Sequence, residues 1–123
     1  MGNLGKFILF SLLIVTLLSF PLAAGEGIVL RIEWNNPFNP EATDARDDYT
    51  SIYYKVSEQG VTIRIYSING DLVRTLVEDS AIMEDNIEWD GKNDKGEIVG
   101  SGVYLVNLKI GKSSKTVKVV VLK

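Results

Sequence analysis

The residues of this chain that could do chemistry are acidic. The 123 residues include 16 Asp and Glu against 13 Lys and Arg, with no His and no Cys. Without His and Cys the chain lacks the usual general base, the thiolate nucleophile and the common ligands of transition metals. Its serines have no His to activate them, so we expect them at turn and surface positions. We therefore predict a protein that is not an enzyme and that uses no cofactor.

Calcium is the ion that suits these residues best, because a hard cation takes carboxylate and carbonyl oxygens from a loop. The candidate ligands are Asp90, Asn93 and Asp94, in a glycine-bearing segment. Their spacing is not that of an EF-hand, because Lys92 and Lys95 stand where a ligand and the loop glycine belong. We favour a turn held by local bonds between side chains and backbone, and predict no metal.

A second acidic segment, residues 41–48, contains Asp44, Asp47 and Asp48, offset only by Arg46. Its lack of hydrophobic periodicity predicts an exposed loop. A solvated loop is the interpretation we favour, and binding of an ion or of a protein partner is the alternative. These three aspartates are therefore the candidate interaction residues.

Strands must position these loops. Residues 61–77 show apolar and polar residues in alternation, then Asn69-Gly70, then a returning strand, which predicts a hairpin with a type I′ turn. Further strands are expected at 28–34, 50–56, 81–89, 102–110 and 116–122, with a loop at 78–80 and turns at 90–96 and 111–114. About seven short strands and no convincing helix predict an all-β, immunoglobulin-like antiparallel sandwich. Its predicted core is Ile52, Ile63, Ile65, Leu72, Leu76, Tyr104, Val106, Leu108 and Ile110.

Four aromatic residues allow two interpretations. Trp34, Phe38, Trp89 and Tyr104 could form a platform on which sugars stack, or they could be core. Aromatic side chains of small sandwiches are mostly buried, so we predict the core, with Trp34 on the same face of the first strand as Ile28, Leu30 and Ile32.

The N-terminus has the pattern of a secretory signal peptide. Lys6 precedes an uncharged apolar run, and small residues follow before Gly25. We predict a Sec-type leader at 1–25 and one domain at 26–123, with an uncleaved membrane anchor as the alternative. The expected location is secreted, periplasmic or on the cell surface, with membrane contact only through an uncleaved leader.

The composition argues against nucleic acid as a partner and against attachment to the membrane through a lipidated cysteine. Without Lys6 the chain has 12 basic and 16 acidic residues, a net charge of −4. Nucleic acid is therefore not an expected partner, because binding to it needs a basic face. The absence of Cys excludes a lipidated N-terminal cysteine and a disulfide.

Short motifs follow one another along the chain, and their positions, in order, are Asn36, Pro37, Phe38, Asn39, Pro40, Asn69, Gly70, Trp89, Asp90, Gly91, Gly102 and Tyr104. In this order they resemble the immunoglobulin-like domain of the flagellar hook-capping protein, the FlgD-like domain. They are similar also to the C-terminal sorting domain of exported bacterial proteins, including cargo of the type IX secretion system. The resemblance implies an immunoglobulin-like sandwich used for attachment, assembly or sorting outside the cytoplasm.

We therefore predict an exported, non-enzymatic module that attaches to or assembles with proteins of the bacterial cell envelope or surface, including a second copy of itself. A strand edge or the acidic loop would make the contact. The alternatives are a module that binds glycans or solutes, and a remnant secretion-sorting domain.

Overall fold

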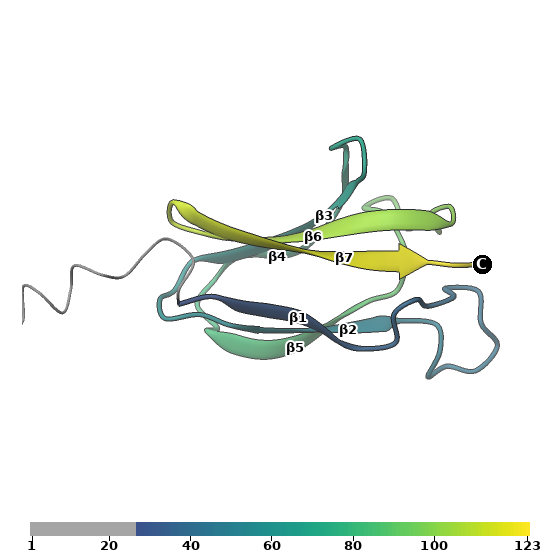
Figure 1. Cartoon of the computed structure of the whole chain (residues 1–123), viewed down its shortest axis with the longest axis horizontal. Helices are drawn as coiled ribbons and strands as arrows, with labels where there is room; N and C mark the ends of the chain where they lie inside the picture. Colours follow the sequence, from purple (N-terminus) through teal and green to yellow (C-terminus); the bar gives the residue numbers. More distant parts are fainter. Residues whose placement is uncertain (1–26) are drawn as a thin grey trace, which may run out of the picture.

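The computed structural model of the protein describes residues 27–123. The predicted signal peptide, residues 1–25, lies outside the described residues. The described part is a sandwich of two antiparallel sheets, one of three strands in the order β1-β2-β5 and one of four in the order β4-β3-β6-β7 (Figure 1). The strands are β1 (Val29–Trp34), β2 (Thr50–Lys55), β3 (Val61–Ser67), β4 (Leu72–Ser80), β5 (Glu84–Trp89), β6 (Gly102–Ile110) and β7 (Ser113–Val121).

These seven strands confirm the predicted all-β class, and residues 27–123 contain no helix long and apolar enough to cross a membrane. The core lies between the sheets because the strands alternate. In β3, Val61, Ile63 and Ile65 have no exposed surface, while the residues between them are partly exposed. Most of the predicted core is confirmed: Ile52, Val106, Leu108 and Ile110 are buried, and Leu76 and Tyr104 pack against them partly buried.

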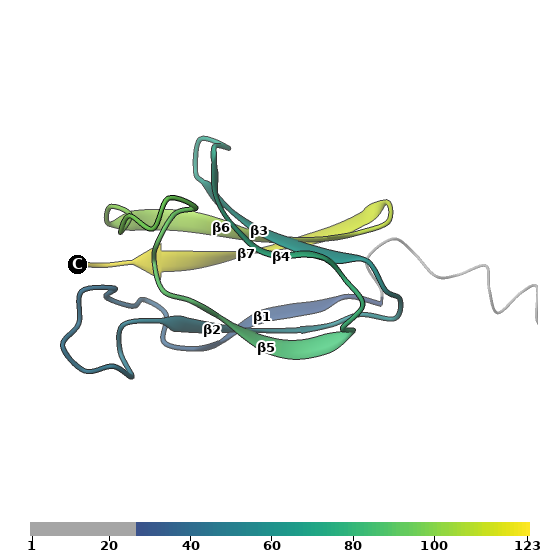
Figure 2. The same cartoon turned by 180° about the vertical axis from the view of Figure 1, so that it is seen from behind.

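Leu72 was wrongly predicted to be core, since 52% of its surface is exposed. The pairing of β3 with β4 shifts register between Ile65 and Tyr66, so that Arg74 lies opposite Ile65 and Leu72 opposite Tyr66. One extra residue in a strand moves the next side chain to the other face. Val73 packs against the core instead. The tip of this hairpin bends away from the four-stranded sheet (Figure 2).

The hairpin itself is confirmed, but its turn is not type I′. A type I′ turn needs positive φ at both central residues. Of the pair Asn69-Gly70 only Gly70 has positive φ, at 90°. The Gly70 N–H donates to the carbonyl of Ser67 at 2.9 Å, so the turn spans 67–70 and ends on a left-handed glycine. Hairpins whose turn ends on a left-handed glycine commonly contain a bulge, and this hairpin has its shift of register next to the turn.

Two strand boundaries also differ from the prediction. The predicted loop at 78–80 is the end of β4, because Ser80 still pairs with Val61. The last hairpin turns on Gly111 and Lys112 alone, because Ser113 already pairs with Ile110. Gly111 has a φ of 57°, which glycine adopts without strain and which suits a two-residue turn with Gly at its first position.

Trp34 was wrongly predicted to be core, since 56% of its surface is exposed. β1 pairs regularly with β2 up to Ile32, but its register shifts before Trp34, which pairs with Ser51. The irregularity at Glu33 turns the Trp34 side chain out of the face that Leu30 and Ile32 share. For the other three aromatics the core prediction holds, since Phe38 and Trp89 are buried and Tyr104 is partly buried.

Candidate functional site

Most of the motif residues meet at one end of the sandwich, while Asn69 and Gly70 lie apart from them in the turn of the β3-β4 hairpin. The ring of Trp89 lies 5.5 Å from the ring of Phe38 and 5.5 Å from the ring of Tyr104, edge to face in both pairs. The Trp89 indole donates to the carbonyl of Lys92 at 2.9 Å, and the Tyr104 hydroxyl to the carbonyl of Gly100 at 2.8 Å. Burial raises the pKa of the Tyr104 hydroxyl. This cluster positions the loop that leaves β5 and the start of β6.

The Asn36–Pro40 corner fastens β1 to β7 of the other sheet. The Asn36 carboxamide oxygen accepts the N–H of Val120 at 2.8 Å. The Phe38 N–H donates to the carbonyl of Val120 at 3.1 Å, and the Phe38 carbonyl accepts the N–H of Leu122 at 3.0 Å. The peptide bond before Pro37 is cis. The corner therefore covers the end of the β7 edge.

The corner also supports the loop after β5, through Pro40 and Gly91. A Cβ on Gly91 would lie 2.6 Å from the Pro40 Cβ, and the φ of Gly91 is 75°. Only glycine fits such a contact without movement of its neighbour. Asn39 shapes the corner, because its side chain accepts the N–H of Glu41 at 2.9 Å. The motif residues of both segments therefore act in packing and turn formation.

Residues 90–96 form a turn that docks on the edge of β4. The Asp94 N–H donates to the carbonyl of Val73 at 2.9 Å, and the Asp94 carboxylate accepts the N–H of Thr75 at 3.1 Å. Arg74 reaches the same loop, 3.7 Å from the Asp90 carboxylate and 4.0 Å from that of Asp94. The loop thus occupies the backbone groups that an edge strand would otherwise present.

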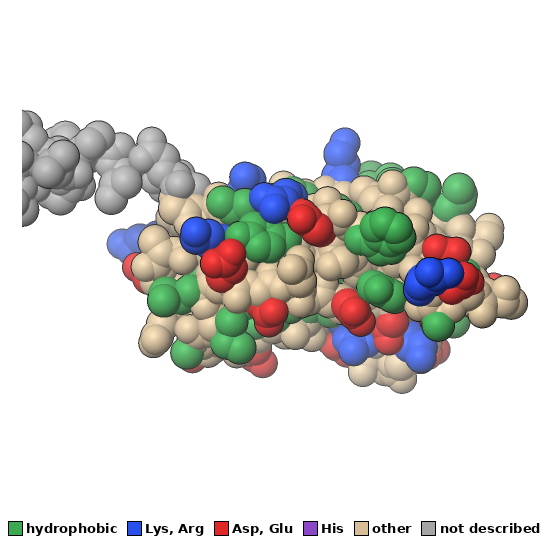
Figure 3. Space-filling view, turned by 90° about the horizontal axis from the view of Figure 1, so that it is seen from below, with side chains coloured by type: hydrophobic (Ala, Val, Ile, Leu, Met, Phe, Trp, Pro, Cys, Tyr) green, Lys and Arg blue, Asp and Glu red, His purple; other side chains and the backbone are tan. Residues whose placement is uncertain are grey.

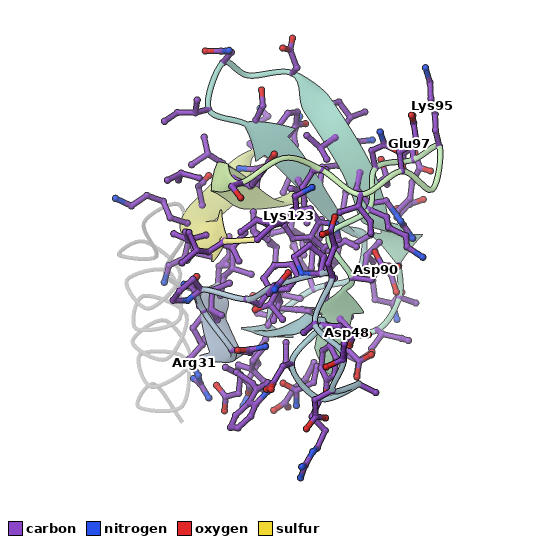
Figure 4. The ribbon with its side chains drawn as sticks, turned by 90° about the vertical axis from the view of Figure 1, so that its right-hand side faces the viewer. Arg31, Asp48, Asp90, Lys95, Glu97 and Lys123 are labelled. Carbon is purple, nitrogen blue, oxygen red and sulfur yellow. The ribbon has the colours of Figure 1, made fainter. Side chains whose placement is uncertain are left out.

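The three candidate calcium ligands take part in the contacts of this turn. The Asp90 carboxylate accepts the N–H of Lys92, and the Asn93 side chain accepts those of Lys95 and Glu97, all at 3.0 Å. No group of three acidic side chains within residues 27–123 is arranged to hold a metal ion. Figure 4 shows Lys95 and Glu97 on this loop, with Asp90 where the loop begins.

The acidic loop, residues 41–48, is at the same end of the molecule (Figure 4, Asp48). It is fixed from β1: the Asn35 side chain donates to the carbonyls of Asp47 and Tyr49, at 2.9 and 3.0 Å. Asp44 accepts the N–H of Arg46 at 3.0 Å, and this bond lowers the pKa of its carboxyl. Asp44 and Asp47 are exposed and Asp48 is half-buried, so the predicted interaction residues do lie on one surface loop.

The outer face of the three-stranded sheet carries charged residues and exposed apolar ones side by side (Figure 3). Arg31 lies 4.2 Å from the centre of the Tyr53 ring and forms an ion pair with Glu33 at 2.6 Å, which lowers the pKa of Glu33. The Tyr53 hydroxyl donates to Glu84 at 2.6 Å, and this bond raises the Tyr53 pKa. Arg31 and Glu33 thus neutralise each other, and the acidic strand β5 lies beside them.

The edges of the two sheets are treated differently. The register of β4 shifts three times against β3, and the 90–96 loop covers its first half, at Val73 and Thr75. The corner covers the end of β7, and β1 contacts β7 and carries its own irregularity. β5 pairs with β2 over all six residues without interruption, and within the described residues no other segment hydrogen-bonds to its outer edge. β7 pairs with β6 without a shift as well, but it is basic and bonded to the corner near its end, so β5 is the regular edge that is both uncovered and acidic.

The backbone groups on the open side of β5 can be assigned. The Val56 N–H donates to the carbonyl of Met83. In an antiparallel ladder every second residue of a strand bonds to the partner strand. Residues 83, 85, 87 and 89 therefore bond toward β2, and Glu84, Asn86 and Glu88 point outward. In agreement, the Asn86 N–H donates to the carboxylate of Asp85 at 2.8 Å and not to β2.

Sequence reasoning did not single out this edge. The sequence predicts a strand at 81–89 but not that it lies at an edge, because strand order cannot be read from alternation in one segment. The available signal was three carboxylates, Glu84, Asp85 and Glu88, within six residues that contain no Gly and no Pro.

Comparison with known proteins shows the fold. No family model matches the chain, so the FlgD-like resemblance stays a prediction, and no curated protein matches it. A solved structure that matches is PorZ, described as an essential surface component of the type IX secretion system of Porphyromonas gingivalis. The TM-score is 0.54 and the identity 22%, over 85% of this chain and 13% of PorZ. The likeness is one of fold, and the chain spans a small part of the length of PorZ.

Proposed function

We propose that this protein is an exported immunoglobulin-like module of the FlgD-like type, which attaches to or assembles with other proteins at the bacterial cell envelope or surface and carries out no reaction. The observation that carries this proposal is the open edge of β5, a row of backbone groups ready for a further strand.

The strand order supports the immunoglobulin-like assignment. A three-stranded sheet faces a four-stranded one, and all pairs are antiparallel. Tyr104, near the start of β6, donates its hydroxyl to the backbone four residues upstream, as the tyrosine corner of immunoglobulin-like domains does. Most of the motif residues that carry the FlgD-like resemblance, Asn69 and Gly70 excepted, gather at one end, which is consistent with a family pattern that preserves a scaffold.

The export pattern at the N-terminus supports a location outside the cytoplasm. The fold shared with part of PorZ, a bacterial surface component, is consistent with that location.

The proposal is tested by exporting the full chain with a C-terminal tag in its native host, cross-linking briefly in intact cells, and purifying the adducts. We expect one envelope or surface protein, or a second copy of the chain, in amounts comparable to the bait. The matched control is the Trp89→Ala variant, which removes the centre of the aromatic cluster and should capture none of it. A wild-type chain recovered alone would contradict the proposal.

Binding of a glycan is a second candidate, favoured by Trp34, whose indole is 56% exposed beside the acidic loop. The four-residue aromatic platform does not exist, because Phe38 and Trp89 are buried. A single exposed indole can still stack on a sugar ring. Retention on a glycan array that is lost in Trp34→Ala but kept in Tyr53→Ala would support this function over attachment to protein.

A further inference from the structure

We propose that β5 is the docking edge and that it receives an antiparallel strand of another protein, with basic residues at positions i, i+3 and i+4. This inference rests on the proposed function, because it names the surface and the chemical class of partner for the same module. Three properties of the edge carry it: its regular geometry, its charge and the apolar residues next to it.

The geometry is that of a strand waiting for a neighbour. Glu84, Asn86 and Glu88 direct their N–H and C=O groups away from β2, at the spacing that an antiparallel partner needs. The edges of β1 and β4 lack such a row, because bulges or the 90–96 loop interrupt them, and the edge of β7 is bonded to the 36–40 corner at Lys118 and Val120. β7 also has a continuous register, but it carries Lys115 and Lys118, so within the described residues a basic incoming strand meets an uninterrupted ladder without like charges only at β5.

The charge of β5 selects what can bind. Its six residues include Glu84, Asp85 and Glu88 and no basic residue, and none of the three takes part in an ion pair within the described part of the chain. Directly opposed residues of paired strands lie close together, and opposite charges there are favourable. If position i faces Glu88, positions i+3 and i+4 face Asp85 and Glu84, and these three should be Lys or Arg.

The remaining positions of the partner follow from the same register. Position i+1 faces Ile87, which is half-buried, so an apolar residue suits it. Position i+2 faces Asn86, where a polar β-former such as Thr fits. Beyond i+4 the strand would pass Met83 and Ile82, which are 43% and 54% exposed and offer an apolar contact.

The Asp85 side chain provides a hydrogen-bond acceptor for an outward N–H of β5 while no partner strand is bound. Its carboxylate accepts the Asn86 N–H at 2.8 Å. A partner carbonyl can take over that N–H, and the released carboxylate can then pair with the basic residue at i+3. The same acidic row disfavours pairing of β5 with β5 of a second copy, because like charges would face each other.

The direct test is titration of the full-length chain with a synthetic strand of about eight residues, the length of an ordinary strand, that contains Lys-Val-Thr-Lys-Lys between neutral Thr residues. We expect it to bind at least about ten-fold more tightly than a scrambled peptide of the same composition. The same peptide with N-methyl groups on its edge-facing amides should lose binding, because it cannot complete the ladder. Equal binding of all three peptides would overturn the inference.

Two protein variants locate the site. Asn86→Pro removes an outward N–H that β2 does not use, a position where an edge strand tolerates Pro, and should weaken binding at least about ten-fold without loss of the cooperative unfolding transition. Glu84→Lys with Glu88→Lys should do the same. The matched control is Asp47→Lys with Asp48→Lys, which changes the net charge equally on the acidic loop and should leave binding intact. Loss of binding in the loop variant and not in the β5 variant would overturn the inference.

The inference and the proposed function can fail separately. If the native envelope partner is captured equally well by wild type and by Asn86→Pro, the module function stands and the β5 edge is wrong. If the chain is captured alone from cells, the proposed function is wrong, whatever the peptide does. Formation of dimers by the wild type that Glu84→Lys with Glu88→Lys abolishes would also overturn the inference, because the occupant would then be a second copy.

Discussion

The two strands that the segment 81–83 connects differ in their outer edges. β4 has nine residues, three shifts of register and a loop hydrogen-bonded to its first half. β5 has six residues, a continuous register and an outer edge to which, among residues 27–123, only the side chain of Asp85 is hydrogen-bonded. Eighteen consecutive residues, 72–89, thus contain one closed edge and one open edge.

The loop that closes β4 begins where β5 ends. After Trp89 the chain crosses to the other sheet and places Asp94 against Val73 and Thr75. An exposed edge invites association with other chains, and proteins usually prevent this with bulges, charge or a cover. β4 uses bulges and a cover, whereas β5 uses charge alone. An acidic edge repels an acidic strand and attracts a basic one, so the comparison indicates that this protein permits pairing at β5.

Replacement of the tryptophan that joins the two edges should have the largest effect. Trp89→Ala empties the centre of the aromatic cluster and removes the anchor of the 90–96 loop, so we expect a loss of about 4 kcal/mol of unfolding free energy. Trp34→Ala removes an equal side chain from an exposed position and should change stability by less than about 0.5 kcal/mol. Denaturant unfolding of the two variants measures the difference, and equal losses would contradict the assigned roles.

Gly91 should come next, because it holds the covering loop against the corner. Gly91→Ala combines a positive φ with a Cβ 2.6 Å from Pro40, and we expect a loss of about 3 kcal/mol. Gly70→Ala is the control, since Gly70 also has positive φ but no atom near the new Cβ, and should cost about 1 kcal/mol. If the two alanine variants unfold at the same denaturant concentration, Gly91 is not a packing contact.

Removing the contact of the 90–96 loop with the β4 edge should have a smaller effect on the free energy of unfolding and a clear effect on amide hydrogen exchange. Asp94→Ala removes the acceptor of the Thr75 N–H, with an expected loss of about 1 kcal/mol and faster hydrogen exchange at Thr75. Asp94→Asn keeps an oxygen in place and should retain most of the protection. An unchanged Thr75 exchange rate in the alanine variant would show that the loop does not close β4.

The smallest effects concern pH. Hydrogen bonds from Arg31 and Arg46 lower the folded-state pKa values of Glu33 and Asp44, so their contribution is present above about pH 4 and is lost as the pH falls further. Burial raises the pKa values of Tyr54 and Tyr104, so their contribution is present below about pH 10 and is lost above it. With no His and no Cys, stability should be nearly flat between about pH 6 and 9. A transition in thermal unfolding inside that window would contradict this.

Most of the fold could be predicted because alternation in strands such as β2, β3 and β6 is strong. The errors fall where one extra residue changes the face of a side chain. Trp34 and Leu72 both follow shifts of register, and no local pattern in their strands announces them. A strand with a bulge and a strand without one can have the same alternation, and only the partner strand determines which side chain turns outward.

The candidate site was less accessible from sequence. The motif residues were found, but their shared position depends on contacts between distant segments, such as Pro40 with Gly91. The open edge of β5 was missed because an edge is defined by what does not pair with it. That property becomes visible only once the order β1-β2-β5 is known.

Residue-resolved amide hydrogen exchange of the full chain compares the two edges most directly. The account predicts protection of Thr75 and Asp94, whose N–H groups are bonded to the loop and to β4, and rapid exchange at Glu84 and Glu88, which point outward from β5. Addition of the Lys-Val-Thr-Lys-Lys peptide should slow exchange at Glu84 and Glu88 and leave Thr75 unchanged. Slow exchange at Glu84 and Glu88 without the peptide, or protection that appears at β4 when it is added, would contradict the account.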